Sequence, residues 1–236
     1  MNYQKSTRLA LAVFVFFAAA RVLNAQVLSV TNRLQLWLKA DAGITTNASG
    51  GVTQWADQST HGNNAVQITD AAAPLFVANA QNNKPALRFD GVDDFLDVAD
   101  ADSISIAGDI SSFFVVKFDD FATYRAVWGK TVDNLPAPTD YYTLPGTGIP
   151  RLYRGDGQGT GASDIGAADG AARFRAGTYL VAGFEMAGTT ATHYLNGQTT
   201  GGGEITATLL DGDQPLKVGT RNDFFTKMKG EIAELL

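Results

Sequence analysis

The chain has 236 residues, with 18 Lys and Arg against 24 Asp and Glu, a net charge of −6, and no cysteine. An acidic chain lacks the basic surface that phosphates require, which excludes nucleic acid as a partner class. The absence of cysteine excludes disulfides and thiolate zinc sites, so a hydrophobic core must hold the fold together.

Residues 1–25 have the pattern of a secretory signal peptide. Lys5 and Arg8 precede the apolar run LALAVFVFFAAA, and the small residue Ala25 offers a cleavage point, with Ala20 as the alternative. The run is too short to span a bilayer, which takes about 20 residues of helix. We predict an exported protein (secreted, periplasmic or on the cell surface) that starts at Gln26 and has no membrane span after cleavage. That chain keeps 15 basic and 24 acidic residues, a net charge of −9.

Short runs of aromatic and β-branched residues, separated by Gly, Asn, Asp and Pro, fill the rest of the chain. Residues 34–40 (LQLWLKA) alternate with the two-residue period of a strand. Asn196-Gly197 predicts a type I′ hairpin turn, because both residues tolerate positive φ angles. Gly-rich residues 155–170 and 201–203 are predicted to be surface loops. Further strands are predicted at residues 113–118, 124–128, 178–185, 190–195, 216–220 and 231–235. The pattern predicts an all-β fold, a two-sheet antiparallel β-sandwich, in one domain.

Residues 83–98 combine a strand, a turn rich in carboxylates and a second strand. Asp90, Asp93 and Asp94 in this turn are candidate ligands for Ca²⁺, which takes six to eight oxygens, so carbonyl groups or Asp57 would have to complete the site. The alternative is that these aspartates accept hydrogen bonds from their own backbone in successive turns.

Two further segments offer groups for a ligand. Trp55, Asp57 and Asn63 lie in one polar stretch, in which Trp55 would stack on a sugar ring while Asp57 and Asn63 bind its hydroxyls. The alternative is that Trp55 belongs to the core and Asp57 closes a structural turn. Tyr153 and Arg154, next to the Gly-rich residues 155–170, are predicted to form a rim for a glycan or a peptide.

The chain ends on an apolar strand, residues 229–236, with no polar turn after it. A domain seldom ends on its own core strand, because exposed edges invite pairing. We therefore expect the domain at residues 26–236 to be truncated at its C-terminal end, with further domains or an anchor beyond it.

The order of these segments resembles the laminin-G-like jelly-roll domains of large exported bacterial proteins, within the concanavalin A-like lectin and glucanase superfamily. The resemblance is carried by residues 34–44, 52–59, 89–96, 194–197 and 229–236. It implies a two-sheet antiparallel jelly roll, frequent Ca²⁺ binding and recognition of carbohydrate or protein. It does not imply catalysis, because one scaffold serves many functions.

Glycoside hydrolysis needs two carboxylates about 5 to 9.5 Å apart. The Glu-x-Asp-x-x-Glu pattern of the related glucanases is absent, and Glu231 and Glu234 point to opposite faces if they lie on one strand. The two histidines are His61 and His193; no Gly-x-Ser-x-Gly motif accompanies them, and His193 beside the hairpin turn is expected to be solvated.

The sequence therefore predicts a non-catalytic binding module for carbohydrate or a protein surface, with Ca²⁺ as a possible cofactor. One alternative is an accessory domain of a glycoside hydrolase whose catalytic part lies beyond Leu236. The other is a structural spacer of a surface or adhesion protein. A binding module predicts exposed aromatic side chains, an enzyme predicts paired carboxylates in a cleft, and a spacer predicts neither.

Overall fold

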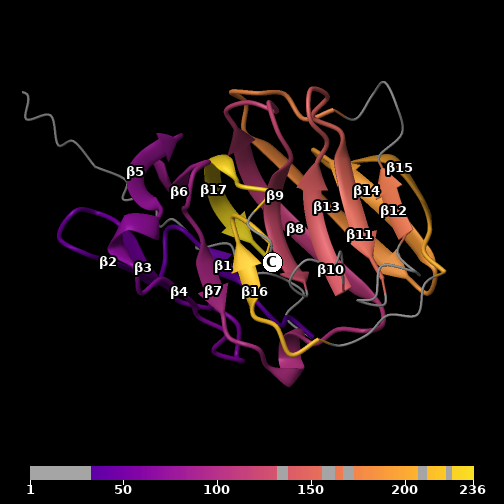
Figure 1. Cartoon of the computed structure of the whole chain (residues 1–236), viewed down its shortest axis with the longest axis horizontal. Helices are drawn as coiled ribbons and strands as arrows, with labels where there is room; N and C mark the ends of the chain where they lie inside the picture. The colour runs from indigo at the N-terminus through magenta and orange to yellow at the C-terminus, as the bar shows by residue number, and fades with distance from the viewer. Residues whose placement is uncertain (1–32, 132–137, 156–162, 167–172, 207–211, 222–224) are drawn as a thin grey trace, which may run out of the picture. The chain divides into compact units, whose positions relative to one another are not determined.

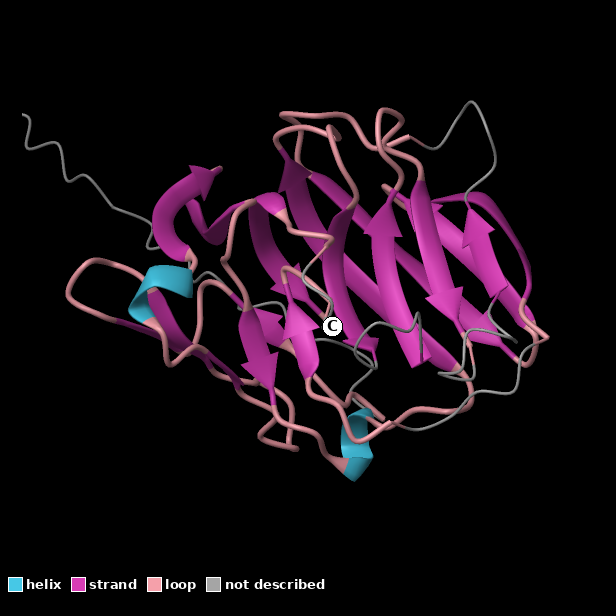
Figure 2. Cartoon of the chain, viewed as in Figure 1, coloured by secondary structure: helices cyan, strands magenta, loops and turns pink. Residues whose placement is uncertain are grey.

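The computed structural model describes residues 33–131, 138–155, 163–166, 173–206, 212–221 and 225–236, so the predicted signal peptide lies outside the described residues. These residues form two antiparallel sheets that lie over each other (Figure 1). The two short helical turns are the 3-10 helices η1 (Asp70–Ala72) and η2 (Asp102–Ile104), both outside the sheets (Figure 2). No helix among the described residues is long and apolar enough to cross a membrane.

The sheet that we call sheet A has eight strands within the described residues. They are β1 (Leu38–Lys39), β5 (Leu75–Gln81), β6 (Lys84–Asp90), β8 (Ile110–Phe118), β13 (Leu180–Ala187), β14 (Thr190–Leu195), β15 (Gln198–Glu204) and β17 (Lys229–Leu235). Their order is β15-β14-β13-β8-β17-β6-β5, and β1 pairs with the far end of β17.

The opposite sheet, sheet B, has nine strands within the same residues. They are β2 (Ile44–Thr46), β3 (Val52–Trp55), β4 (Ala65–Val66), β7 (Leu96–Val98), β9 (Arg125–Thr131), β10 (Pro138–Thr143), β11 (Pro150–Arg154), β12 (Ser163–Gly166) and β16 (Leu216–Val218). Their order is β12-β11-β10-β9-β16-β7-β4-β3-β2. The chain passes repeatedly from one sheet to the other, and the predicted all-β two-sheet antiparallel jelly roll is confirmed.

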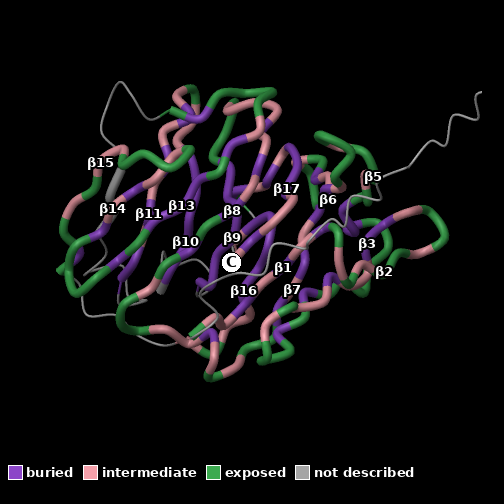
Figure 3. The backbone as a smooth tube through the Cα atoms, turned by 180° about the vertical axis from the view of Figure 1, so that it is seen from behind, coloured by how far each residue is buried: buried purple, intermediate pink, exposed green. Residues whose placement is uncertain are grey.

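Along strands such as β8 and β13, buried residues alternate with more exposed ones, which Figure 3 shows as alternating colours. In β8, Phe114 and Val116 are buried between the sheets, whereas Phe113 and Val115 point away from the core. Aromatic rings join the two sheets: Tyr141 of sheet B stacks on Phe184 of sheet A, with 5.4 Å between ring centroids. Each such ring adds roughly 1.5–3 kcal/mol to folding through its burial.

The strand, carboxylate-rich turn and second strand predicted in residues 83–98 are present, and the turn leads from β6 in sheet A to β7 in sheet B. Two predicted loops are corrected. Residues 201–203 are not a loop but part of β15, and a Cβ on Gly202 would lie 2.0 Å from the carbonyl oxygen of Ala191. Glycine is found there because the neighbouring strand comes too close for any side chain. Of the predicted loop at residues 155–170, Ser163–Gly166 form β12, and residues 156–162 and 167–170 lie outside the described residues.

Candidate functional site

The Trp55 side chain is completely buried in the core, with 0% of its surface exposed. It therefore presents no ring face to a sugar, and the prediction that it binds a ligand is corrected in favour of the core alternative. The physical reason is its position at the end of β3, paired with β2 and β4, where an indole fills space between the sheets. In the sequence Trp55 lies in a polar stretch, and strand β3 was not predicted from it.

Asp57 organises the loop after β3 through its own hydrogen bonds. Its carboxylate accepts hydrogen bonds from the backbone amides of Trp37, Ser59 and Asn63, each between 2.8 and 2.9 Å, and from the Ser59 hydroxyl at 2.6 Å. The Asn63 side chain is buried, and its amide nitrogen donates to the carbonyl oxygen of Gln35 at 2.7 Å. Both side chains hold the loop together, which favours the structural alternative for Asp57 and Asn63.

Tyr153 and Arg154 lie in β11 and do not form a loop rim. The Arg154 side chain is 1% exposed and donates to the carbonyl oxygens of Gly108 at 2.9 Å and Ile106 at 2.5 Å. Burial lowers the pKa of Arg154 to about 10, against an opposing effect of the nearby carboxylate of Asp109. Arg154 is thus a clamp inside the fold, which corrects its predicted ligand contact, while the neighbouring Tyr153 is half-buried.

Asp90, Asp93 and Asp94 do come together in the crossover between β6 and β7, and one oxygen of each lies within 4.8 Å of the others. Asp90 Oδ1 accepts hydrogen bonds from the amides of Val92 at 2.7 Å and Asp93 at 3.3 Å, and Asp94 Oδ2 accepts from the amide of Asp90 at 2.8 Å. These are the turn hydrogen bonds of the alternative interpretation.

The same three carboxylates also supply hard oxygen donors of the kind that Ca²⁺ takes. Burial raises the pKa of Asp94 to about 6; the hydrogen bond from the Asp90 amide opposes this rise, and the charges of Asp90 and Asp93 add to it. The donor set fits a hard cation, and calcium binding at this turn stays a prediction.

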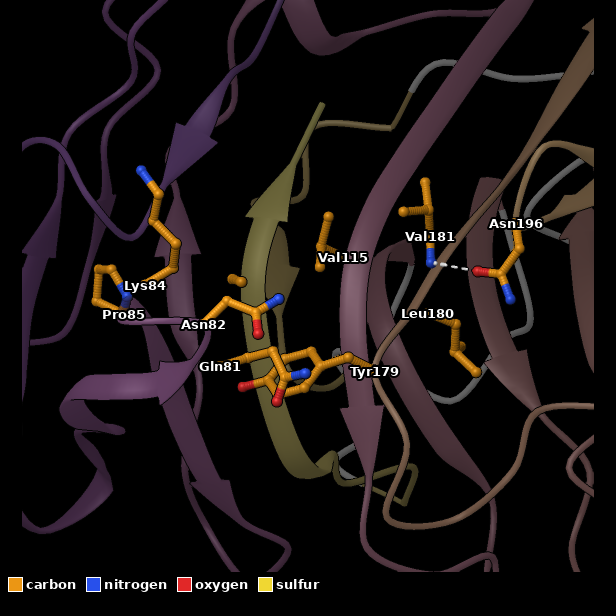
Figure 4. A pocket seen from close by; sticks show the side chains of 10 residues that line it. Gln81, Asn82, Lys84, Pro85, Val115, Tyr179, Leu180, Val181 and Asn196 are labelled. Carbon is orange, nitrogen blue, oxygen red and sulfur yellow. Dashed lines mark hydrogen bonds between the residues drawn. The ribbon is translucent and has the colours of Figure 1, made fainter. Parts of the chain in front are cut away.

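A groove of about 370 Å³ lies on the outer face of sheet A, the face turned away from sheet B (Figure 4). We call it the sheet-A groove. Its residues come from the β5-β6 hairpin, from β8 and β17, from the start of β13 and from the turn after β14. They are Gln81, Asn82, Lys84, Pro85, Val115, Tyr179, Leu180, Val181, Asn196 and Ala233.

The floor of the sheet-A groove is apolar and crosses three neighbouring strands. Val115 of β8 is paired directly with Val181 of β13, and Ala233 lies in β17 on the other side of β8. Val181 is 50% exposed, so its side chain is open to contact from outside the sheet. Small apolar side chains here leave a shallow surface that a flat ligand face can contact.

Two hairpin turns supply polar groups at the two sides of this floor. Asn82, with φ 51°, and Asn83, with φ 58°, form the turn between β5 and β6, and Asn196, with φ 48°, and Gly197, with φ 79°, form the turn between β14 and β15. Both turns have two residues with positive φ, as a type I′ turn requires, so the predicted Asn196-Gly197 hairpin is confirmed. The Asn196 Oδ1 atom accepts from the Val181 amide at 3.0 Å, which fixes the orientation of its amide group (Figure 4).

A partly exposed aromatic pair extends the same face beyond the groove. Phe113 of β8 and Tyr194 of β14 have ring centroids 5.8 Å apart, across Gly183 of β13. The Tyr194 hydroxyl donates to Glu185 Oε2 at 3.2 Å. Phe113 is 36% exposed, so the pair offers a ring surface and a polar group to a ligand that leaves the groove.

A network of charges borders the groove at Tyr179, whose hydroxyl donates to Glu231. Glu231 also accepts from Lys117 at 2.8 Å and Arg88 at 3.2 Å. Burial raises the pKa of Glu231, but the hydrogen bonds from Lys117 and Tyr179 and the charges of Lys117 and Arg88 outweigh it, so the net pKa is lowered. Arg88 in turn pairs with Asp119 through both of its terminal nitrogens.

The groove was not predicted from the sequence. The sequence contains two signals that could have indicated it: the alternation of residues 113–118, which places Phe113 and Val115 on one face, and the Asn196-Gly197 turn. His193 was expected to be solvated, whereas this side chain is fully buried, with Nδ1 3.1 Å from the Tyr141 hydroxyl. Which face of a strand is buried depends on the opposite sheet, and alternation alone leaves that open.

No family model and no curated protein matches this chain. The solved structures it is similar to include domain 4 of AbnA, a GH43 extracellular arabinanase from Geobacillus stearothermophilus, in complex with arabinotriose. That likeness covers 85% of this chain and 89% of the domain, at 13% identity and a TM-score of 0.59.

Two further structures share the architecture. The Botulinum neurotoxin serotype D ligand-binding domain in complex with N-acetylneuraminic acid is matched over 85% of this chain and 45% of its own length, at 12% identity and a TM-score of 0.55. The CBM40 of the Ruminococcus gnavus IT-sialidase, bound to α2,3-sialyllactose, is matched over 64% of this chain and 87% of its own length, at 10% identity and a TM-score of 0.52. At these identities the likeness shows the fold, and it confirms the two-sheet antiparallel jelly roll.

Proposed function

We propose that this chain is a non-catalytic carbohydrate-binding module and that the sheet-A groove is its binding site. The observation that carries the proposal is the apolar floor of Val115, Val181 and Ala233 between two turns that each present an asparagine, Asn82 and Asn196. Sugar rings have apolar C–H faces and hydroxyl edges, and a pocket with an apolar base and a few placed polar groups suits both.

The comparisons support this proposal in a second way. The three similar domains were each solved with a saccharide or a sialic acid: arabinotriose, N-acetylneuraminic acid and α2,3-sialyllactose. Because unrelated functions share one fold, the likeness supports the ligand class and leaves the position of the site to the geometry of this chain.

An accessory role next to a glycoside hydrolase is the second candidate. It is favoured by the likeness to domain 4 of an arabinanase, which matches nearly the whole of that domain. In this role the module would hold a polymer close to a catalytic domain, without cleaving it. Export, Ca²⁺ binding and a protein partner stay predictions from the sequence.

The test is isothermal titration calorimetry of the purified protein against a panel of soluble oligosaccharides, together with the Val181→Gln variant. This substitution places a longer polar side chain on the groove floor without adding charge. The matched control is Ala187→Gln, an exposed position on the same strand and face but outside the groove. We expect the wild type to release or absorb heat on binding at least one sugar. Val181→Gln should lose this binding, and Ala187→Gln should keep it. If the wild type binds no sugar, the result supports the spacer alternative.

A further inference from the structure

We propose, resting on the proposed function, that the sheet-A groove binds an uncharged saccharide and discriminates against sugars that carry a carboxylate. The similar domains include two solved with sialic acid or a sialylated sugar, so this inference separates the chain from them. It is based on the charges around the groove, which are already balanced before any ligand arrives.

The one cationic side chain among the residues that line the groove is Lys84. Its Nζ atom lies 3.2 Å from Asp41 Oδ2, and the other oxygen of Asp41 lies 3.4 Å from Lys39 Nζ. The neighbouring carboxylate of Glu234, in the strand paired with β1, accepts from Trp37 Nε1 at 2.7 Å. Asp41 thus pairs with both lysines, and Glu234 is the register partner of Lys39 across β1 and β17. Two carboxylates therefore lie beside the two lysines, and this side of the groove presents no net positive charge.

The second group of cations borders the groove at Tyr179. Arg88 and Lys117 both contact Glu231, and Arg88 also holds Asp119 with two hydrogen bonds. A fork-shaped guanidinium recognises a carboxylate by such a paired contact, and in Arg88 the fork is already occupied by one. A sugar carboxylate placed beside Tyr179 would be repelled by Glu231. To bind Arg88, it would have to displace Asp119 or Glu231 from that side chain.

The uncharged polar groups point to the opposite ligand chemistry. Gln81, Asn82 and Asn196 all carry side-chain amides, and an amide has both donors and an acceptor. A sugar hydroxyl likewise donates and accepts, so the two groups can pair in either direction without a net charge. The chain as a whole has a net charge of −6, which repels an anionic ligand before it reaches the groove.

The experiment compares matched sugars by calorimetry: lactose with 3′-sialyllactose, galactotriose with trigalacturonate, and arabinotriose as a further neutral probe. We expect binding of at least one neutral sugar, lost in Val181→Gln, and an affinity at least about tenfold weaker for a carboxylated partner, since like charges brought together oppose binding. Raising the salt from about 0.01 M to about 1 M should narrow this gap, because the Debye length falls from about 30 Å to about 3 Å.

The variant Asp41→Asn tests the cause directly. It removes the partner of Lys84 at an exposed position, so the affinity for the carboxylated sugars should rise while that for the neutral sugar stays unchanged. The control is Asp70→Asn, an exposed carboxylate outside the groove, which should change neither affinity.

The outcomes distinguish this inference from the proposed function. If carboxylated sugars bind the wild type as tightly as neutral ones and Val181→Gln abolishes that binding, the groove binds carbohydrate but the inference is wrong. If no sugar of either kind binds, both the proposed function and the inference are wrong. Binding that survives Val181→Gln places the site elsewhere and overturns both the groove assignment and the inference.

Discussion

Asn82 and Asn196 occupy the same position in two type I′ hairpin turns, and both line the sheet-A groove from opposite sides. They are 114 positions apart in the chain and belong to strands at different places in the sheet, with β17, β8 and β13 between them. The left-handed backbone that makes each turn tight is tolerated by asparagine, so one residue type serves the turn and provides an amide for the groove.

Asn82→Gly should weaken sugar binding about three- to tenfold, the effect of losing one hydrogen bond worth roughly 0.5–1.5 kcal/mol. Glycine keeps the positive φ of the turn, so the hairpin is preserved while the amide is removed. The matched control is Asn83→Gly in the same turn, which does not line the groove and should bind normally in calorimetry. Equal losses in both variants would contradict a contact specific to Asn82.

Gly183→Ala should destabilise the fold, because a Cβ there would lie 2.2 Å from the carbonyl oxygen of Ser112 and 2.6 Å from the Phe113 ring. We expect a loss of about 1–3 kcal/mol, as for other overpacked positions. Thermal unfolding measures it, with Gly108→Ala as the control, since nothing lies within 4 Å of a Cβ at that position. An unchanged melting temperature in Gly183→Ala would mean that β8 and β13 lie further apart than described.

Arg154→Leu should lower stability by about 2–5 kcal/mol, because the carbonyl oxygens of Ile106 and Gly108 lose their donors inside the fold. Urea unfolding measures the change, and the exposed Arg175→Leu is the control. Sugar affinity of the folded fraction should not change. If Arg154→Leu kept full stability but lost sugar binding, the result would support the ligand contact that the sequence predicted for Arg154.

Glu231→Gln should flatten the loss of stability in acid. The folded-state pKa of Glu231 lies below its ordinary value of 4.5, so the folded state favours the charged form and the unfolded state binds the proton more readily. The stability from Lys117, Arg88 and Tyr179 is therefore present above pH 4.5 and is lost as the pH falls below it. The measurement is the free energy of unfolding from pH 7 to pH 3, with the exposed Glu204→Gln as the control, which should keep the wild-type slope.

The calcium hypothesis predicts a rise in melting temperature with CaCl₂. A site of about 1 mM affinity, common in extracellular modules, would stabilise the fold by about 1.4 kcal/mol at about 10 mM Ca²⁺. For a domain of this size that is a shift of roughly 3–6 °C. Asp93→Asn should remove the shift, whereas Asp102→Asn, an exposed aspartate outside the cluster, should keep it. The same melting temperature with Ca²⁺ and with chelator would leave these aspartates to the turn alone.

The sequence by itself determined the fold class and about half of the described strands. Residues 113–118, 190–195 and 231–235 fall within β8, β14 and β17, because alternation and tight-turn residues act over a few neighbouring positions. The Asn196-Gly197 turn was predictable for the same reason, since its φ angles are imposed by two residues alone.

Only the tertiary structure decided which of these side chains reach a ligand. Alternation divides a strand into two faces but does not say which one meets the other sheet. Arg154 and His193 are therefore found inside although their sequence context suggested exposure, and Trp55, which the sequence left open between the core and a ligand site, is buried as well. The sheet-A groove joins segments from residue 81 to residue 233, and it exists because the strand order brings β6, β17, β8 and β13 side by side. Pairing between distant segments depends on the packing of the whole core, which no local pattern contains.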